Sequence, residues 1–305
     1  MRRLGVLILT LACVQCGGHA PTEPSGAPPP VVVPPDPPVP TPSPPPPAST
    51  QIFVGAGDIG QCDANSEATA KLLDGIGGTV FTLGDNAYFS GTADEFRRCY
   101  DPTWGRHKSR TRPVPGNHEY DSPGAAPYFA YFGASAGPAG LGYYSFDVGS
   151  WHAIALNSNI DVSAGSAQAA WLRGDLAASR ARCTIAYWHH PLFTSGPNGP
   201  SLRMQEFWRL LYEAAVDVVL NGHEHLYERF GLQDVGGAPD PTRGIREFIA
   251  GTGGAALYQP ISIARNSERR LSTFGLLRLT LQADGYQWEF IPVSGAGDTG
   301  SGTCH

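Results

Sequence analysis

The stretch AAVDVVLNGHEH, residues 214–225, decides the fold class, because an apolar run of strand length ends at a turn that two histidines follow. The run 214–220 predicts a short buried strand, and Asn221-Gly222 is a turn signal. Side chains two residues apart in extended chain point the same way, so His223 and His225 can face one spot. Two solvated histidines in a turn would give the same local pattern, so the rest of the chain has to distinguish the two interpretations.

The same pattern of an apolar run followed by a polar cluster occurs four more times along the chain. The runs 52–56, 79–83, 112–115 and 184–188 lead into Gly57-Asp58-Ile59-Gly60, Gly84-Asp85-Asn86-Ala87-Tyr88, Gly116-Asn117-His118-Glu119 and His189-His190-Pro191. Helical patterns lie between these runs, and strands that alternate with helices predict an α/β fold. Ligands in α/β folds bind at the carboxyl ends of strands, which is where all five polar clusters stand.

Three segments have helical patterns, namely 66–73 with Asn65 as its N-cap, the alanine-rich 167–178, and 202–215. The glycine-, proline- and aromatic-rich stretch 121–142 has no clear period and predicts a long loop, either near the site or as an ordinary surface excursion. From Glu247 onward the runs 248–250, 275–281 and 286–293 predict strands. We expect these late strands to form a second sheet packed on the first.

Each polar cluster alone is common in turns, where aspartate hydrogen-bonds its own backbone. Together the clusters supply two carboxylates, an amide oxygen, a phenol and at least three imidazoles, all at predicted strand ends. This inventory suits two metal ions that share a bridging carboxylate.

The five clusters, in this order, resemble the motif blocks of the purple acid phosphatases, which belong to the metallophosphoesterase (calcineurin-like) superfamily. Leu226-Tyr227-Glu228-Arg229, directly after the last cluster, resembles that family too. The resemblance covers essentially all of residues 51–305. It implies a four-layer αββα sandwich, in which two packed sheets are flanked by helices.

The resemblance also implies a ligand set for two metal ions. Asp85 would bridge both ions; Asp58, Tyr88 and His225 would complete the first site, and Asn117, His189 and His223 the second. Many superfamily members have a histidine at the position of Gly60, so Tyr88 would supply the missing ligand. A phenolate suits Fe³⁺, and the second site would suit Zn²⁺, Mn²⁺ or Fe²⁺.

The implied activity is metal-dependent hydrolysis of phosphate monoesters of small molecules, with a metal-bound hydroxide as the nucleophile. His118 is the candidate to bind the phosphate or protonate the leaving oxygen, although it could instead only orient a carboxylate. His190 is interpreted as structural.

Two other functions stay open from the sequence. Substrate-contacting histidines that the plant and animal enzymes carry downstream are missing from residues 194–200. A phosphodiesterase on the same scaffold is therefore an alternative. A third hypothesis is an exported protein that binds phosphorylated ligands without turnover.

The first fifty residues predict export. Residues 1–18 read as a signal peptide, since the apolar run Leu4 to Ala12 after Met1-Arg2-Arg3 is too short to span a bilayer. Thr10-Leu11-Ala12-Cys13 resembles a lipoprotein signal with Cys13 as the lipidated residue, and free secretion is the alternative. Residues 19–50 form a proline-rich linker that favours polyproline II, and residues 51–305 form the catalytic domain. We expect a secreted, periplasmic or cell-surface protein.

Four cysteines follow the linker, and an even number in an exported chain predicts two disulfides. Of the three connectivities we favour Cys62–Cys99 and Cys183–Cys304, because the second would tie down a glycine-rich tail; free thiols or metal ligands are the alternative. The net charge is −6 and no basic run exists, which argues against a nucleic-acid-binding surface. No feature indicates a protein partner.

Overall fold

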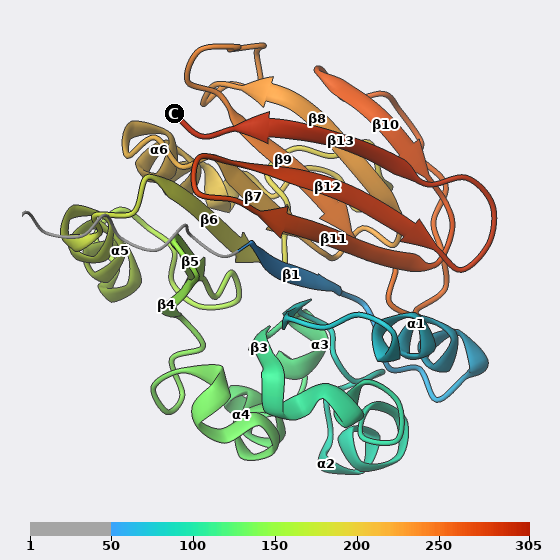
Figure 1. Cartoon of the computed structure of the whole chain (residues 1–305). Helices are drawn as coiled ribbons and strands as arrows, with labels where there is room; N and C mark the ends of the chain where they lie inside the picture. The colour runs from blue at the N-terminus through green and yellow to red at the C-terminus, as the bar shows by residue number, and fades with distance from the viewer. Residues whose placement is uncertain (1–49) are drawn as a thin grey trace, which may run out of the picture. The chain divides into compact units, whose positions relative to one another are not determined.

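The computed structural model describes residues 50–305, which form two β-sheets packed face to face with helices on their outer sides (Figure 1). The predicted signal peptide 1–18, Cys13 and all but the last residue of the linker 19–50 lie outside the described residues. In the described part, no helix is both long enough and apolar enough to cross a membrane. The expected four-layer αββα architecture is confirmed.

The first sheet has six strands in the order β13-β12-β11-β1-β2-β3. Their bounds are β1 Gln51–Ala56, β2 Thr79–Leu83, β3 Thr111–Val114, β11 Gly275–Leu281, β12 Gly285–Pro292 and β13 Asp298–Thr303. Strands β1, β2 and β3 are parallel, and β11 pairs with β1 in antiparallel orientation. The prediction of a separate C-terminal sheet is therefore wrong for β11 to β13, because they extend the sheet that β1 begins.

The second sheet has seven strands in the order β10-β8-β9-β7-β6-β5-β4. Their bounds are β4 Tyr144–Val148, β5 Trp151–Ala155, β6 Cys183–Trp188, β7 Val218–Asn221, β8 Tyr227–Gln233, β9 Ile245–Ala250 and β10 Ser267–Leu271. The four central strands β5, β6, β7 and β9 are parallel. The strand predicted at 214–220 begins only at Val218, because the preceding helix continues to Glu213 and Ala215 turns the chain with a φ of 56°.

The α-helices are α1 Ala64–Asp74, α2 Ala93–Glu95, α3 Asn117–Tyr120, α4 Ala126–Phe132, α5 Ala167–Ala178 and α6 Gln205–Glu213. Helix α5 has the predicted bounds. Helix α1 is capped by Asp63 and not by Asn65, because the Asp63 carboxylate accepts the backbone N–H groups of Asn65 and Ser66. The predicted loop 121–142 contains α4, whose aromatic side chains pack inward.

Shorter helical turns occur at Phe96–Tyr100, Trp104–Arg110, Pro123–Ala125, Gly133–Ala136 and Leu202–Met204. The last of these replaces the first turn of the helix predicted at 202–215.

The core has three layers of packed side chains. Between the sheets, Phe53 and Leu277 of the first sheet meet Ile185 and Phe248 of the second. Alternate residues of the same strands point outward, as the two-residue period of a strand requires. Ala186 of β6, for example, packs under α5 and α6, while Val54 of β1 belongs to the cluster beneath α1 and α4.

A largely buried carboxylate also links the sheets. Asp298 of β13 accepts hydrogen bonds from the Tyr227 hydroxyl at 2.7 Å, from Arg229 Nε at 2.7 Å and from Trp288 Nε1 at 3.2 Å. Tyr227 and Arg229 lie on β8 of the opposite sheet. The Asp298 side chain is only 10% exposed, so these donors meet their acceptor away from bulk water.

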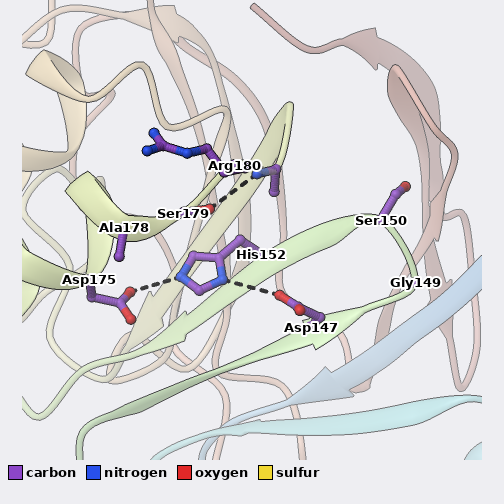
Figure 2. A pocket seen from close by; sticks show the side chains of 9 residues that line it. Asp147, Gly149, Ser150, His152, Asp175, Ala178, Ser179 and Arg180 are labelled. Atoms are coloured by element: carbon purple, nitrogen blue, oxygen red, sulfur yellow. Dashed lines mark hydrogen bonds and ion pairs between the residues drawn. The ribbon is translucent and has the colours of Figure 1, made fainter.

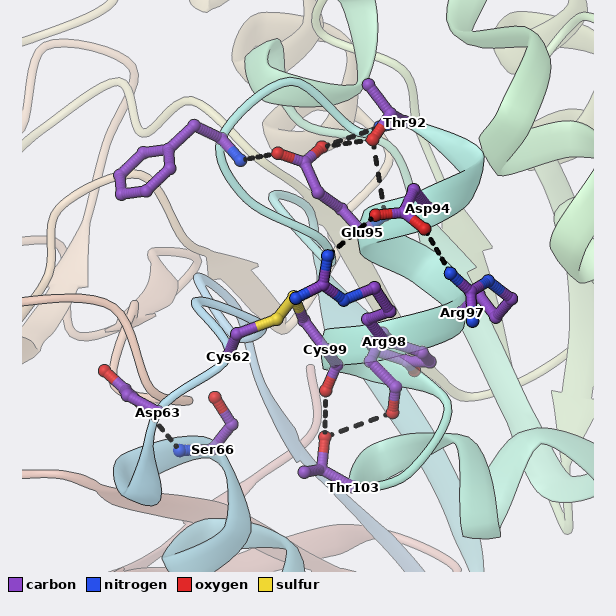
Figure 3. Close-up of a disulfide and its surroundings, with 12 residues drawn as sticks. Cys62, Asp63, Ser66, Thr92, Asp94, Glu95, Arg97, Arg98, Cys99 and Thr103 are labelled. Carbon is purple, nitrogen blue, oxygen red and sulfur yellow. Dashed lines mark hydrogen bonds and ion pairs between the residues drawn. A yellow bond between two sulfur atoms is a disulfide. The ribbon is translucent and has the colours of Figure 1, made fainter.

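Both favoured disulfides are present. Cys62–Cys99 joins the turn after β1 to the helical turn Phe96–Tyr100 (Figure 3). Cys183–Cys304 joins the start of β6 to the end of the chain, with 121 residues of sequence separation. The glycine-rich tail is thus held at both ends of its strand, by the sheet and by the disulfide.

Candidate metal centre

The carboxyl ends of strands from both sheets meet at one edge of the sandwich, and all eight predicted site residues lie there. Strands β1, β2 and β3 contribute the turns that carry Asp58, Asp85 and Asn117. Strands β6 and β7 of the other sheet contribute the histidine turns. The sheets are joined at this edge by the backbone N–H of Gly57, which donates to the carbonyl of Ala250 at 2.8 Å.

One group of donor atoms gathers around the Tyr88 hydroxyl. Its oxygen lies 3.0 Å from Asp58 Oδ1, 3.2 Å from Asp85 Oδ2 and 3.2 Å from His225 Nε2. His225 Nε2 is also 3.2 Å from Asp58 Oδ1. Atoms bound to one metal ion at about 2.1 Å stand about 3 Å from their neighbours in a six-coordinate arrangement, so these spacings suit a single ion.

A second group shares one atom with the first. Asp85 Oδ2 lies 3.2 Å from His189 Nε2, which in turn is 3.0 Å from Asn117 Oδ1 and 3.2 Å from His223 Nδ1. The same Asp85 oxygen therefore faces both groups. The structure thus brings together all seven side chains expected to hold metal, in the two sets that the family resemblance implies.

Backbone hydrogen bonds hold the two carboxylates in place. The N–H of His223 donates to Asp58 Oδ2, and the N–H of His118 donates to Asp85 Oδ1, each at 2.9 Å. Each carboxylate thus has one anchored oxygen, while its other oxygen faces the centre.

Two of the imidazoles are oriented in a similar way. His189 Nδ1 lies 2.7 Å from the carbonyl oxygen of Leu83, and His225 Nδ1 lies 2.8 Å from that of Ala256. A carbonyl oxygen can only accept, so both Nδ1 atoms carry the proton. In the neutral ring, Nε2 then has the lone pair that a metal ligand requires, and it faces the cluster.

The turns need unusual backbone conformations. Asp58, Asp85 and His223 have positive φ angles of 59°, 48° and 69°, in the left-handed region where side chains other than glycine cost roughly 1 kcal/mol or more. Gly116 is required by close approach, because a Cβ there would stand 2.1 Å from Asp85 Oδ1. The local strain is offset by the sheets and hydrogen bonds on either side.

The charge balance of the cluster is unusual for a buried site. Among residues 50–305, no lysine or arginine forms an ion pair with Asp58 or Asp85, and the only basic side chains paired with them are histidines. Burial raises the pKa of Asp85, but the adjacent His189 outweighs it and holds the pKa below the usual carboxyl range. Burial, together with Asp58 and Asp85, raises the pKa of Tyr88 well above its usual value.

His118 sits beside the cluster without joining it. Its side chain is 28% exposed, and its Nε2 lies 3.7 Å from Asp85 Oδ2. Its ring lies 4.4 Å from the Tyr88 ring, and its Nδ1 is 2.5 Å from the Phe89 carbonyl oxygen. Because a carbonyl oxygen can only accept a hydrogen bond, Nδ1 carries the proton, and Nε2 is the nitrogen available to the centre.

Two supporting features were missed in the sequence. Buried Glu119 accepts the N–H groups of Asn86, Ala87 and Gly116, so one carboxylate holds two of the ligand turns. Ser158 contacts His190 beside the histidines of the cluster. The signal for Ser158 was available, because the run 151–156 ends in Asn157-Ser158-Asn159 just as the five other runs end in polar residues.

Another titratable cluster lies apart from these residues, in a cavity of about 470 Å³ at the outer edge of the second sheet (Figure 2). The His152 ring stands between two carboxylates, with Nε2 2.8 Å from Asp175 and Nδ1 3.2 Å from Asp147. The hydrogen bond with Asp175 and the contact with Asp147 raise the pKa of His152, although burial opposes the effect. The His152 cluster ties β4 and β5 to α5.

Comparison with known proteins gives consistent results. The profile of the family "Calcineurin-like phosphoesterase" matches residues 53–227. Purple acid phosphatase 22 of Arabidopsis thaliana is 30% identical over 291 residues, in an alignment that covers 87% of this chain and 61% of that protein. The chain therefore spans about three-fifths of the length of that relative.

Solved structures show the same fold. The purple acid phosphatase from yellow lupin (Lupinus luteus) seeds superposes with a TM-score of 0.73 at 21% identity, over 84% of this chain and 54% of that one. A dimetal phosphatase from Danio rerio superposes with a TM-score of 0.59 at 14% identity, over 85% of this chain and 100% of that one.

Proposed function

The chain belongs to the calcineurin-like phosphoesterase family, and we propose that it hydrolyses phosphate monoesters at two metal ions. One observation carries the proposal: a single Asp85 oxygen lies 3.2 Å from both the Tyr88 hydroxyl and His189 Nε2, at the junction of two donor groups. A carboxylate in that position can bridge two cations. Similarity to purple acid phosphatases supports hydrolysis of monoesters.

The residues fit a metal pair on chemical grounds. Two carboxylates are fully buried without an arginine or lysine partner in the described part of the chain, which is costly unless a cation compensates them. In their neutral form, His189 and His225 direct the Nε2 lone pair toward the same space. We assign Asp58, Tyr88 and His225 to one ion, Asn117, His189 and His223 to the other, and Asp85 to both.

When bound, the metal pair neutralises phosphate oxygens and makes water acidic enough to serve as the nucleophile near neutral pH. The chain's own residues do the rest. The anchored carboxylates keep their positions during the reaction, because their outer oxygens are held by backbone N–H groups. His118, with Nε2 directed toward the centre, is placed to bind a phosphate oxygen or to protonate the leaving alcohol.

We assign Fe³⁺ to the Tyr88 side and Fe²⁺, Zn²⁺ or Mn²⁺ to the other. The raised pKa of Tyr88 means that a phenolate forms there only with a strong cation at its oxygen. The iron-loaded protein should therefore show a charge-transfer absorption band that Tyr88→Phe removes. A colourless, fully active, iron-free protein would exclude this assignment.

The test of the activity is hydrolysis of an aryl phosphate monoester and of the matching diester, side by side, by the metal-loaded protein. Faster turnover of the monoester is expected, and Asp85→Asn should abolish it together with metal binding. Faster turnover of the diester would favour the phosphodiesterase. If neither ester is hydrolysed and Asp85→Asn loses metal but still binds phosphorylated ligands, the protein is a binder without turnover.

The phosphodiesterase is favoured by one feature of the structure. The segment 194–200, which has no histidine, lies against the turn of the metal-ligand histidines, since Asn198 Nδ2 donates to the His223 carbonyl at 3.0 Å. Without imidazoles, this segment has fewer side chains that would exclude a second ester substituent.

We further propose that the protein is exported, with residues 51–305 as the catalytic domain and Cys13 as the site of a lipid anchor. The two disulfides support an oxidising compartment. Metabolic labelling with a fatty acid tests the anchor. Label that disappears in Cys13→Ala is expected, whereas label that persists in this variant excludes Cys13.

A further inference from the structure

His190 is an imidazole beside the candidate metal centre to which the proposed function gives no role. Its ring lies 4.4 Å from the ring of His223 and 4.9 Å from that of His189. One side-chain nitrogen from each of these three histidines lies within 4.8 Å of the other two. His190 thus borders the second group of donors, while His118 borders the first.

Ser158, three residues after the end of β5, determines which nitrogen of His190 carries the proton. Its Oγ lies 2.8 Å from His190 Nδ1 and accepts the backbone N–H of His190 at 3.3 Å. Ser158 is fully buried, and within residues 50–305 its hydroxyl proton has no acceptor other than His190 Nδ1. A buried hydroxyl keeps its hydrogen bond, so Ser158 donates to Nδ1 and the neutral ring carries its proton on Nε2.

That Nε2–H group is a donor without an acceptor. No protein atom of the described residues accepts from it, although the imidazole is held from its other side and cannot turn away without losing Ser158. An N–H donor held in this way beside two proposed metal ligands is placed for an anion that binds the metals.

We propose that His190 is a substrate-binding residue whose Nε2–H donates to an oxygen of the phosphate group, with Ser158 as the residue that orients it. The inference rests on the proposed function, because the anion is the phosphate of a substrate at the second metal position. It also supplies a histidine contact on the side where the segment 194–200 has none. The phosphate would then be held between His118 and His190.

The test compares inhibition by inorganic phosphate, metal content and turnover of an aryl phosphate in wild type, in two variants of His190, and in one variant each of Ser158 and His305. In His190→Asn the amide reaches the position of Nδ1 and keeps the contact with Ser158, but no donor remains at the position of Nε2. Hydrogen bonds to charged groups are among the stronger ones, so phosphate should inhibit this variant about 10- to 100-fold more weakly. His190→Gln, whose amide nitrogen reaches the position of Nε2, should retain most of the inhibition.

Metal content should stay at the wild-type value in both variants of His190. His305→Asn, the same change at a histidine at the end of the chain, should leave phosphate inhibition unchanged. Ser158→Ala keeps His190 but removes the group that orients it, so it should weaken phosphate inhibition less than His190→Asn. Ser158→Ala therefore tests the role of His190 even if His190→Asn does not fold.

Wild-type phosphate inhibition in His190→Asn or in Ser158→Ala would overturn the inference. Loss of metal from His190→Asn would also overturn it, because His190 would then be a metal ligand. Both results leave phosphatase activity of the wild type intact. Failure of the proposed function is a different result, in which the metal-loaded wild type hydrolyses no ester.

Discussion

Replacing Cys183 and Cys304 together with alanine is expected to lower the free energy of unfolding by about 5 kcal/mol. The disulfide closes a loop with a sequence separation of 121 residues, and a cross-link of that length removes much of the conformational freedom of the unfolded chain. Both cysteines are buried, so alanine introduces no polar group into the core. The Cys62–Cys99 loop has a separation of only 37 residues, and its loss should cost about 4 kcal/mol.

The assay is equilibrium unfolding in urea of the metal-free protein, followed by tryptophan fluorescence and circular dichroism. With a denaturant dependence of about 3 kcal/mol per molar, the unfolding midpoint should fall by roughly 1 to 2 M without Cys183–Cys304. The Cys62→Ala/Cys99→Ala protein is the matched control and should lose slightly less. Our reasoning from loop length fails if the midpoint does not move, or if the shorter loop proves the more important one.

Three further changes test the site, the charge balance and the sheet packing. Gly116→Ala, whose Cβ would stand 2.1 Å from Asp85 Oδ1, should weaken metal binding about 10-fold or more; unchanged affinity in a calorimetric titration would contradict this. The pKa of His152 is raised in the folded protein, so its stabilisation is complete below its unfolded pKa of about 6.5 and is lost as the pH rises through the folded value. The stability difference between wild type and His152→Asn should therefore shrink from pH 6 to pH 8, and a constant difference would refute the ion pairs. Asp298→Ala leaves three hydrogen-bond donors between the sheets without their acceptor and should lower the free energy of unfolding by about 3 kcal/mol or more. A urea midpoint equal to that of the wild type would show that these donors find other acceptors.

Local sequence determined the parts of the protein that depend on neighbours along the chain. The five apolar runs each end in a polar turn, and five strands with those turns occur in the structure. The bounds of α5 follow from its alanine-rich pattern in the same way. Both disulfides were also anticipated, although the chain alone left three pairings open.

Predictions failed where a choice depends on residues far apart. Strand β11 pairs with β1 and not with a separate sheet, although more than two hundred residues lie between them. The N-cap of α1 is Asp63 and not the predicted Asn65, because the path of the chain into α1 decides which side chain reaches the free N–H groups. The stretch 121–142 contains helix α4 because its aromatic residues pack into a core, which composition cannot show.

The same distinction between local and long-range information applies to the candidate metal centre. The types of donor could be read from the sequence, because turns after strands place short polar side chains at a sheet edge. Only the tertiary structure decides that one Asp85 oxygen faces both donor groups and that Ser158 reaches His190 from 32 residues away. These relations depend on the packing of one sheet against the other, and on hydrogen bonds between turns that share no stretch of sequence.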